Sequence, residues 1–118
     1  MTYKPGDVVL VGFPFTSLSA TKKRPAVVIS SQNYQTSRPD IILLAITSQV
    51  RQPLGFGEGL ISDWQDAGLL KPSVFKPLIA TVEQSLVIRL MGQLTHRDQQ
   101  SLQRILQQLF SSSPAFPE

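Results

Sequence analysis

The apolar residues of this chain fall into short runs, and only its C-terminal part shows a helical repeat. The runs are rich in Val, Ile and Leu, and they span residues 7–13, 25–30, 40–47, 73–75, 78–81 and 86–91. β-Branched residues in runs of this length favour strands. The run 40–47 is apolar at successive positions, which predicts a central strand that is buried on both faces.

The segments between these runs are polar or rich in Gly and Pro. We expect loops at residues 16–23 and 32–39, and an irregular connection at residues 51–59, which contain three Gly. Pro77 stands between two of the short runs. Because Pro cannot donate to a strand ladder, we expect two separate strands there.

The C-terminal part has one apolar stripe at helical spacing, formed by Leu102, Ile105, Leu106, Leu109 and Phe110. Thr95 and Asp98 have the spacing of a capping box, which predicts a helix from about residue 95 to residue 110. We expect one domain over residues 1–110 and a flexible tail at residues 111–118. Several strands followed by one helix predict a mainly β domain, a small curled barrel with the helix covering part of it.

The composition limits the chemistry. The 118 residues include no Cys and a single His, so a disulfide framework, a zinc-thiolate site and a pair of catalytic histidines are all excluded. No apolar run approaches the ~20 residues of a membrane helix. The first residues do not resemble a signal peptide, so we expect a cytoplasmic protein.

The net charge of +3 is unevenly distributed along the chain. Residues 1–51 contain six Lys and Arg against two Asp, whereas residues 52–118 contain five basic and six acidic side chains. The excess therefore belongs to the N-terminal part. A concentrated basic surface attracts a polyanion, although a few extra Lys also serve solubility alone.

Two clusters contain candidate site residues. Lys22 and Lys23 precede Arg24, which Pro25 restricts to an extended backbone. A guanidinium matches the geometry of a phosphate, but the same cluster is compatible with a solvated basic turn. In the second cluster, Thr47, Ser48 and Gln49 follow the predicted central strand. Their side chains suit phosphate oxygens or base edges, or alternatively cap their own backbone.

Aromatic side chains near loops form a third group of candidates. Phe13 and Phe15 fit core packing better than base stacking. Phe56 stands between two Gly and is the best candidate for an exposed ring that stacks on a base. His96 falls in the first turn of the predicted helix, where we expect it to be exposed and without a catalytic role.

Several segments together resemble the PemK/MazF family of toxins. They are residues 6–11, the Phe13-Pro14-Phe15 triplet, residues 23–30 and residues 45–49, followed by residues 68–74 and 89–94. The similarity runs in order from Lys4 to about Leu109. The Gly-Asp strand, the Arg-Pro pair and the Ile-Thr-x-Gln strand end are specific only in combination.

The resemblance implies a small SH3-like β-barrel with a C-terminal helix, present as a homodimer. It implies an endoribonuclease (an mRNA interferase) that needs no metal or cofactor and cuts single-stranded RNA selectively. The ribose 2′-OH attacks the adjacent phosphate, leaving a cyclic phosphate and a 5′-OH end. The family's catalytic positions match Arg24 and Thr47. We expect Ser19, Lys22, Lys23, Ser48, Gln49 and Phe56 to bind RNA.

The first loop departs from the family pattern. Some members have a carboxylate or His there that is able to take the 2′-OH proton, but residues 16–21 contain neither, so no general base is assigned. The family implies a cognate antitoxin as partner, with DNA contacted only through the antitoxin complex. Two alternatives stay open: a non-enzymatic barrel that inhibits a protein target such as DNA gyrase, and an inactive barrel that binds only an antitoxin.

Overall fold

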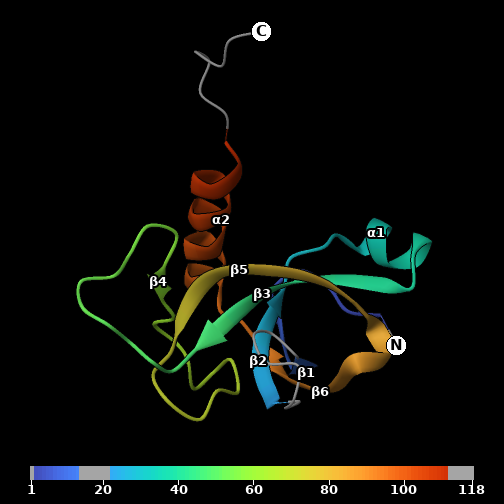
Figure 1. Cartoon of the computed structure of the whole chain (residues 1–118), viewed down its shortest axis with the longest axis horizontal. Helices are drawn as coiled ribbons and strands as arrows, with labels where there is room; N and C mark the ends of the chain where they lie inside the picture. Colours follow the sequence, from blue (N-terminus) through green and yellow to red (C-terminus); the bar gives the residue numbers. More distant parts are fainter. Residues whose placement is uncertain (1, 14–21, 112–118) are drawn as a thin grey trace, which may run out of the picture.

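The computed structural model describes residues 2–13 and 22–111. Along the chain the elements are β1 (Asp7–Phe13), β2 (Lys22–Val28), α1 (Gln32–Ser37), β3 (Asp40–Thr47), β4 (Gly59–Leu60), β5 (Val74–Glu83), the short 3-10 helix η1 (Gln84–Leu86), β6 (Val87–Gln93) and α2 (His96–Phe110). The strands form one antiparallel sheet in the order β4-β5-β3-β2-β1-β6 (Figure 1). The predicted mainly β fold with a C-terminal helix is confirmed.

The sheet is strongly curved, and its inner strands are buried on both faces (Figure 1). Successive residues of β3 illustrate this: Leu43 belongs to one buried cluster and Leu44 to the other. Successive residues of β1 and β2 likewise alternate between the two buried clusters. In the described residues β4 and β6 are the sheet's edges and do not pair with each other, so the ladder stays open.

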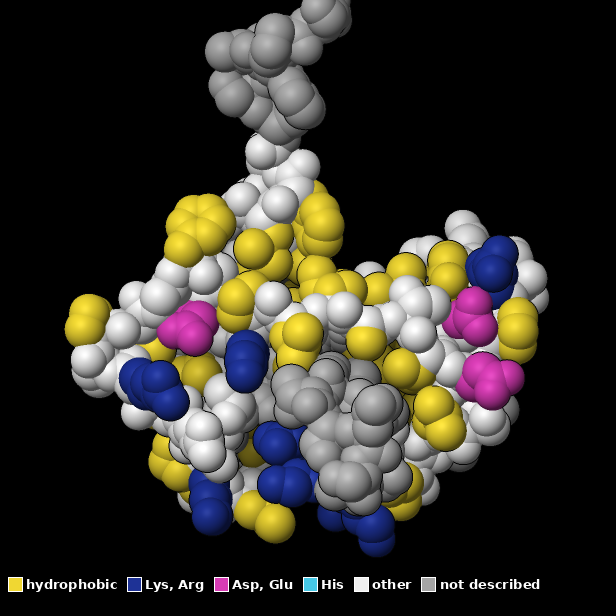
Figure 2. All heavy atoms as spheres, viewed as in Figure 1, with side chains coloured by type: hydrophobic (Ala, Val, Ile, Leu, Met, Phe, Trp, Pro, Cys, Tyr) yellow, Lys and Arg dark blue, Asp and Glu magenta, His cyan; other side chains and the backbone are white. Residues whose placement is uncertain are grey.

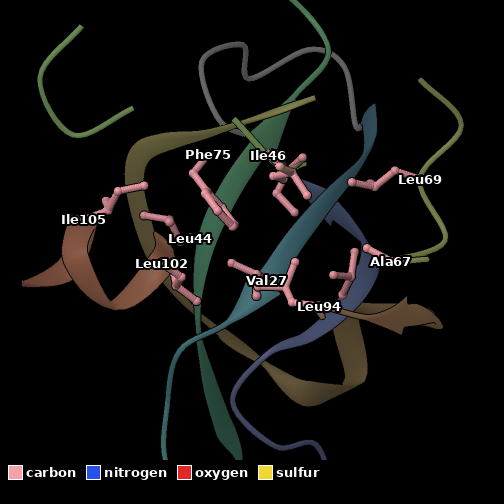
Figure 3. Close-up of a cluster of buried hydrophobic side chains, with 11 residues drawn as sticks. Val27, Leu44, Ile46, Ala67, Leu69, Phe75, Leu94, Leu102 and Ile105 are labelled. Atoms are coloured by element: carbon pink, nitrogen blue, oxygen red, sulfur yellow. The ribbon is translucent and has the colours of Figure 1, made fainter. Parts of the chain in front are cut away.

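The helix α2 covers one face of the sheet. Leu102 and Ile105 point from α2 towards Phe75 of β5 and Leu44 of β3 (Figure 3). Leu106 and Leu109 pack against the same cluster and are partly buried. Phe110 was expected in this stripe but is 67% exposed, because it lies in the last turn of the helix, beyond the packed part.

The prediction of a loop at residues 32–39 was wrong, because α1 forms there. Its N-cap is Ser31, whose hydroxyl accepts a hydrogen bond from the backbone N–H of Tyr34 at 3.1 Å. Inside the helix, Gln35 is buried and accepts a hydrogen bond from the hydroxyl of Ser30 at 2.8 Å. A helix of only six residues leaves little sequence signal, since it is too short for an apolar stripe.

The two strands expected on either side of Pro77 are one strand, β5. It pairs with β3 at Ile46–Phe75 and again at Leu44–Ile79. Three residues of β5, Lys76 to Leu78, therefore lie opposite the single residue Ala45. Pro77 lacks a backbone N–H, and the ladder accommodates it with this irregularity instead of ending there.

Asp98 does not form the predicted capping box. Its carboxylate accepts hydrogen bonds from the backbone N–H groups of Ser62 at 2.9 Å and of Asp63 at 2.8 Å. Thr95 is the N-cap residue of α2, but its hydroxyl donates to Asp63 at 2.6 Å. Asp63 also receives two hydrogen bonds from Arg97. The beginning of α2 is thus tied to the segment that follows β4.

In the described part of the chain, no helix has both the length and the apolar composition needed to cross a membrane.

Candidate functional site

A groove opens where β2 and β3 stop pairing. Their ladder ends at the pair Ala26–Ala45, and the next residue of β2 is Pro25, which has no N–H to donate. Pro25 was expected to begin this strand but lies inside it, since β2 starts at Lys22. Continuing the register by two residues places Arg24 opposite Thr47. Opposite residues of antiparallel strands share one face, so both side chains belong to the same side of the sheet.

The groove has a volume of about 500 Å³ and combines basic, polar and apolar lining. Its cations are Lys22, Lys23, Arg24 and Lys71. Its hydroxyl and amide groups come from Thr47, Ser48, Gln49 and Ser73. Its apolar lining includes Leu10, Leu69, Leu70 and Met91. Charged and apolar groups together suit a ligand that has both anionic and flat apolar parts.

Two glycines hold the apolar side of the groove in place. Gly68 has φ +81°, and a Cβ added there would collide with the carbonyl oxygen of Met91 in β6. Gly92 is constrained by space alone, because a Cβ added there would lie 2.6 Å from the backbone of Ala67. This close backbone approach places Leu69 and the residues after it beside β6.

A smaller cavity of about 130 Å³ adjoins the groove. The two share Arg24, Ile46, Thr47 and Gln49 as lining residues. Lys76 and Leu78 of β5 line only the smaller cavity. The pair Arg24 and Thr47 therefore stands at the junction of the two hollows.

The lining of both cavities is cationic without acidic partners. Among the residues that the structure describes, no Asp or Glu lines either cavity, and the ion pairs formed are Arg38–Asp40 and Arg97–Asp63, away from the groove. Figure 2 shows Lys and Arg side chains gathered at the lower centre of one face, over the beginning of β2, with no Asp or Glu among them. Unpaired cations around a concave surface concentrate a positive potential there.

The hydroxyl of Thr47 is held by its own backbone. It accepts a hydrogen bond from the N–H of Gln49 at 3.1 Å. This is the backbone-capping role that the sequence left open for the strand end. The bond uses the oxygen as acceptor and leaves the hydroxyl proton available for donation to a ligand.

The described lining offers no conventional proton acceptor. Among residues 2–13 and 22–111, no His, Asp or Glu lines either cavity, and residues 14–21 contain none of these types in the sequence. His96 is exposed at the start of α2, as expected, and lines neither cavity. In the same described residues, no cluster of three acidic or His side chains has metal-binding geometry.

The structure brings most of the sequence-predicted site residues together. Arg24 and Thr47 line both cavities, and Lys22, Lys23, Ser48 and Gln49 line the groove. Lys22 and Lys23 were expected on a loop, but they lie in β2 and pair with Phe13 and Gly12 of β1. Their positions are therefore fixed by the sheet.

Two predicted contacts are not part of this group. Ser19 lies outside the described residues. Phe56 is 74% exposed, as expected, but it lines neither cavity. A Cβ added to the neighbouring Gly57 would lie 3.1 Å from Leu109 of α2 and 3.1 Å from Pro77, so this segment packs beside the helix.

The sequence interpretation missed the lysines from the second part of the chain. Lys71 and Lys76 line the groove and the smaller cavity, although residues 52–118 have no net basic charge. A count along the chain cannot find them, because the acidic residues of the same part lie elsewhere. The signal available was local: Lys71 follows the conspicuous Leu69-Leu70 pair, and Lys76 precedes Pro77.

Comparison with known proteins identifies the family. The model of PemK-like, MazF-like toxins of type II toxin–antitoxin systems matches residues 4–110. The chain belongs to this family. The sequence resemblance described above is thereby confirmed. A search of curated protein sequences found no significant match.

Solved structures of MazF-like toxins share the fold. An endoribonuclease in complex with its cognate antitoxin from a mycobacterial species has a TM-score of 0.74 and 16% identity, covering 95% of this chain and 99% of that one. MazE–MazF from Deinococcus radiodurans (Form III) has a TM-score of 0.72 and 16% identity, covering 96% and 100%. The Mycobacterium tuberculosis toxin MazF-mt6 has a TM-score of 0.70 and 19% identity, covering 91% and 98%.

Proposed function

We propose that this MazF-like toxin is an endoribonuclease that cuts single-stranded RNA at the junction of the two cavities. The observation that supports this most strongly is the position of Arg24 and Thr47, which both line the groove and the smaller cavity just beyond the last β2–β3 pair. Among the described residues, the lining around them is cationic and contains no Asp or Glu. An mRNA is the expected substrate.

The proposed reaction uses a nucleophile from the substrate. The ribose 2′-OH attacks the adjacent phosphorus, the new O2′–P bond forms and the P–O5′ bond breaks. The products are a 2′,3′-cyclic phosphate and a 5′-OH end, the 2′-OH proton being lost and a proton being gained by the leaving oxygen. Negative charge grows on the non-bridging phosphate oxygens during the attack.

Arg24 and Thr47 are suited to stabilise that charge. A guanidinium remains protonated at any working pH and presents several N–H donors in one plane. The hydroxyl of Thr47, held by Gln49, donates one further hydrogen bond. Donors fixed before the reaction stabilise a developing oxyanion without reorganising, and losing one typically reduces kcat by about 10²–10³-fold.

The lining favours an unpaired strand over a duplex. In single-stranded RNA the bases are free to turn away from the backbone. The phosphates then meet the cations of the groove, while a base packs against its apolar residues, among them the highly exposed Leu70. A duplex keeps its bases stacked inside and presents none to such a wall.

A cognate antitoxin is the second proposed partner. Two of the similar structures are described as complexes, one with a cognate antitoxin and one as MazE–MazF. An antitoxin segment with acidic and apolar side chains would match the groove and exclude RNA by occupying it. The homodimer stays a prediction of the family resemblance.

The decisive experiment is cleavage of a long unstructured RNA in EDTA, with the ends mapped. We expect the wild type to leave cyclic phosphate and 5′-OH ends, and an all-deoxy strand of the same sequence to stay intact. Arg24→Ala and Thr47→Val should each reduce kcat by about 10²-fold or more while keeping the wild-type melting temperature. Thr47→Ser, which retains the hydroxyl, should keep most of the activity.

Full activity in Arg24→Ala or Thr47→Val would remove that residue from the proposed site. A strict need for Mg²⁺ would contradict the proposed reaction.

No His, Asp or Glu among the described residues lines the site as a proton acceptor, and this observation favours a non-enzymatic alternative. The same groove then binds a protein target such as DNA gyrase without cutting RNA. Growth arrest on expression with RNA left intact by the purified protein would favour this alternative. No arrest and no cleavage would favour an inactive barrel.

A further inference from the structure

We propose that the smaller cavity, with Lys76 as its cation, binds a second phosphate of the RNA strand next to the one held by Arg24 and Thr47. This inference rests on the proposed endoribonuclease function and extends it to a residue and a cavity that the sequence did not suggest. Lys76 thereby becomes a substrate-binding residue that acts outside the bond-breaking step.

The irregularity of β5 creates this cavity. Lys76, Pro77 and Leu78 lie opposite the single residue Ala45, so the strand arches over one residue of β3. Alternate residues of a strand point to opposite faces. Accordingly, Lys76 and Leu78 both line the smaller cavity, whereas Pro77 lies close to Gly57 on the other side. Ala45, whose side chain is only a methyl group, also lines the cavity.

The position of the cavity continues the proposed path of the backbone. It shares Arg24, Thr47 and Gln49 with the main groove, so a strand bound at the junction extends into it without leaving the protein surface. Cations then stand on both sides of the junction, Lys71 in the groove and Lys76 in the cavity. Successive phosphates of one strand therefore each meet a positive charge.

The charge of Lys76 is available to a ligand. The side chain is exposed, and no Asp or Glu among the described residues pairs with it or lines the cavity. The volume of about 130 Å³ is small and fits a phosphate group better than a base. A lysine ammonium binds phosphate as a point charge, which favours strand binding without reading sequence.

The test measures binding separately from cleavage. The probe is a 2′-fluoro RNA octanucleotide, which lacks the attacking hydroxyl and cannot be cut by the proposed reaction. We expect Lys76→Gln to weaken its binding by about 3- to 10-fold in low salt. The slope of log K against log salt should become shallower by about 0.7, the value for one phosphate contact of a single strand.

A matched variant controls for net charge. Arg104→Gln removes one positive charge from the exposed face of α2, outside both cavities, and should leave affinity and slope unchanged. Lys76→Arg should restore binding. With cleavable RNA, Lys76→Gln should raise KM and change kcat by less than about 2-fold, whereas Arg24→Ala lowers kcat.

Each failure has its own signature. A wild type that neither binds the probe nor cuts RNA contradicts the proposed function. A wild type that does both, with Lys76→Gln equal to Arg104→Gln in affinity and slope, overturns the second phosphate site alone. A loss of kcat in Lys76→Gln with unchanged probe binding also overturns it.

Discussion

Asp98 is a charged residue that the fold has placed inside the protein, with only 1% of its surface exposed. Its carboxylate is satisfied by the backbone N–H groups of Ser62 and Asp63, as a buried charge requires. The residue that the sequence assigned to the cap of α2 therefore holds the connection after β4 instead. The role of Thr47 also depends on a neighbouring residue, because the backbone N–H of Gln49 holds its hydroxyl in place at the groove.

Asp63 gives a residue-scale prediction about pH. Hydrogen bonds from Arg97 and Thr95 lower the pKa of the Asp63 carboxyl from 3.8 to about 2. The folded state thus favours the ionised form. Its contribution to stability is complete above pH 3.8 and is lost as the pH falls towards 2. We expect Arg97→Gln to be less stable than the wild type at pH 6, with the difference shrinking between pH 4 and pH 2.

Urea unfolding across this pH range measures the effect. Arg104→Gln, which changes an exposed Arg of the same helix, should run parallel to the wild type at every pH. A wild-type advantage over Arg97→Gln that is equal at pH 6 and pH 2 would contradict the assignment.

At the scale of elements, the site depends on where strand pairing is interrupted. Pro25 stands where the β2–β3 ladder ends, and Pro77 stands at the irregular part of the β3–β5 ladder. Both interruptions follow from the missing N–H of proline, and they open the groove and the smaller cavity on the two sides of β3. Gly68 is the third feature that shapes the groove, because its close contact with β6 holds the groove's apolar side in place.

Gly68→Ala tests this contact. A side chain at φ +81° is strained, and the Cβ meets the backbone of Met91, which has no flexible end to move aside. We expect the free energy of unfolding to fall by about 2–4 kcal/mol, with weaker RNA binding as Leu69 and Leu70 shift. Chemical denaturation and binding of the octanucleotide probe measure the two effects.

Gly55→Ala is the matched control. A Cβ there meets only the flexible carboxylate end of Glu58, at 3.3 Å, so we expect a change within about 0.5 kcal/mol. Equal stability of Gly68→Ala and Gly55→Ala would show that the approach of residues 67–68 to β6 does not constrain the fold.

At the scale of the whole molecule, the charge distribution matters more than the net charge. A net charge of +3 attracts a polyanion only weakly. Five of the cations, however, lie together at the two cavities, and they come from β2, β5 and the connection before β5. They are Lys22, Lys23, Arg24, Lys71 and Lys76. The described acidic side chains lie away from this lining, which leaves the local potential positive.

This gathering predicts a strong effect of salt on RNA binding. If all five cations contact phosphates, the slope of log K against log salt approaches about −3.5 for a single strand. We therefore expect a slope between about −2 and −3.5, measured by fluorescence anisotropy with the octanucleotide probe. A flat salt response would contradict an electrostatic RNA site, as would equal affinity for a duplex of the same length.

Local sequence patterns predicted most of the strands, the C-terminal helix and most residues of the candidate site. These signals are local: β-branched runs, one helical stripe, an Arg before a Pro, and hydroxyls at a strand end. α1 was not predicted because a helix of six residues is too short to show a helical period. The sequence did not predict β5 as one continuous strand, because its pairing with β3 outweighs the local effect of Pro77.

Which distant residues come together depends on strand pairing and on packing between segments. The pairing of β2 with β3 up to Ala26–Ala45 brings Arg24 and Thr47 to the same groove. The contact of Gly68 with β6 brings the segment that ends in Lys71 to that groove as well. The fold also places Phe56 outside both cavities and brings Lys76 to the smaller one. Strand register and backbone packing are properties of pairs of segments, so no single stretch of sequence contains them.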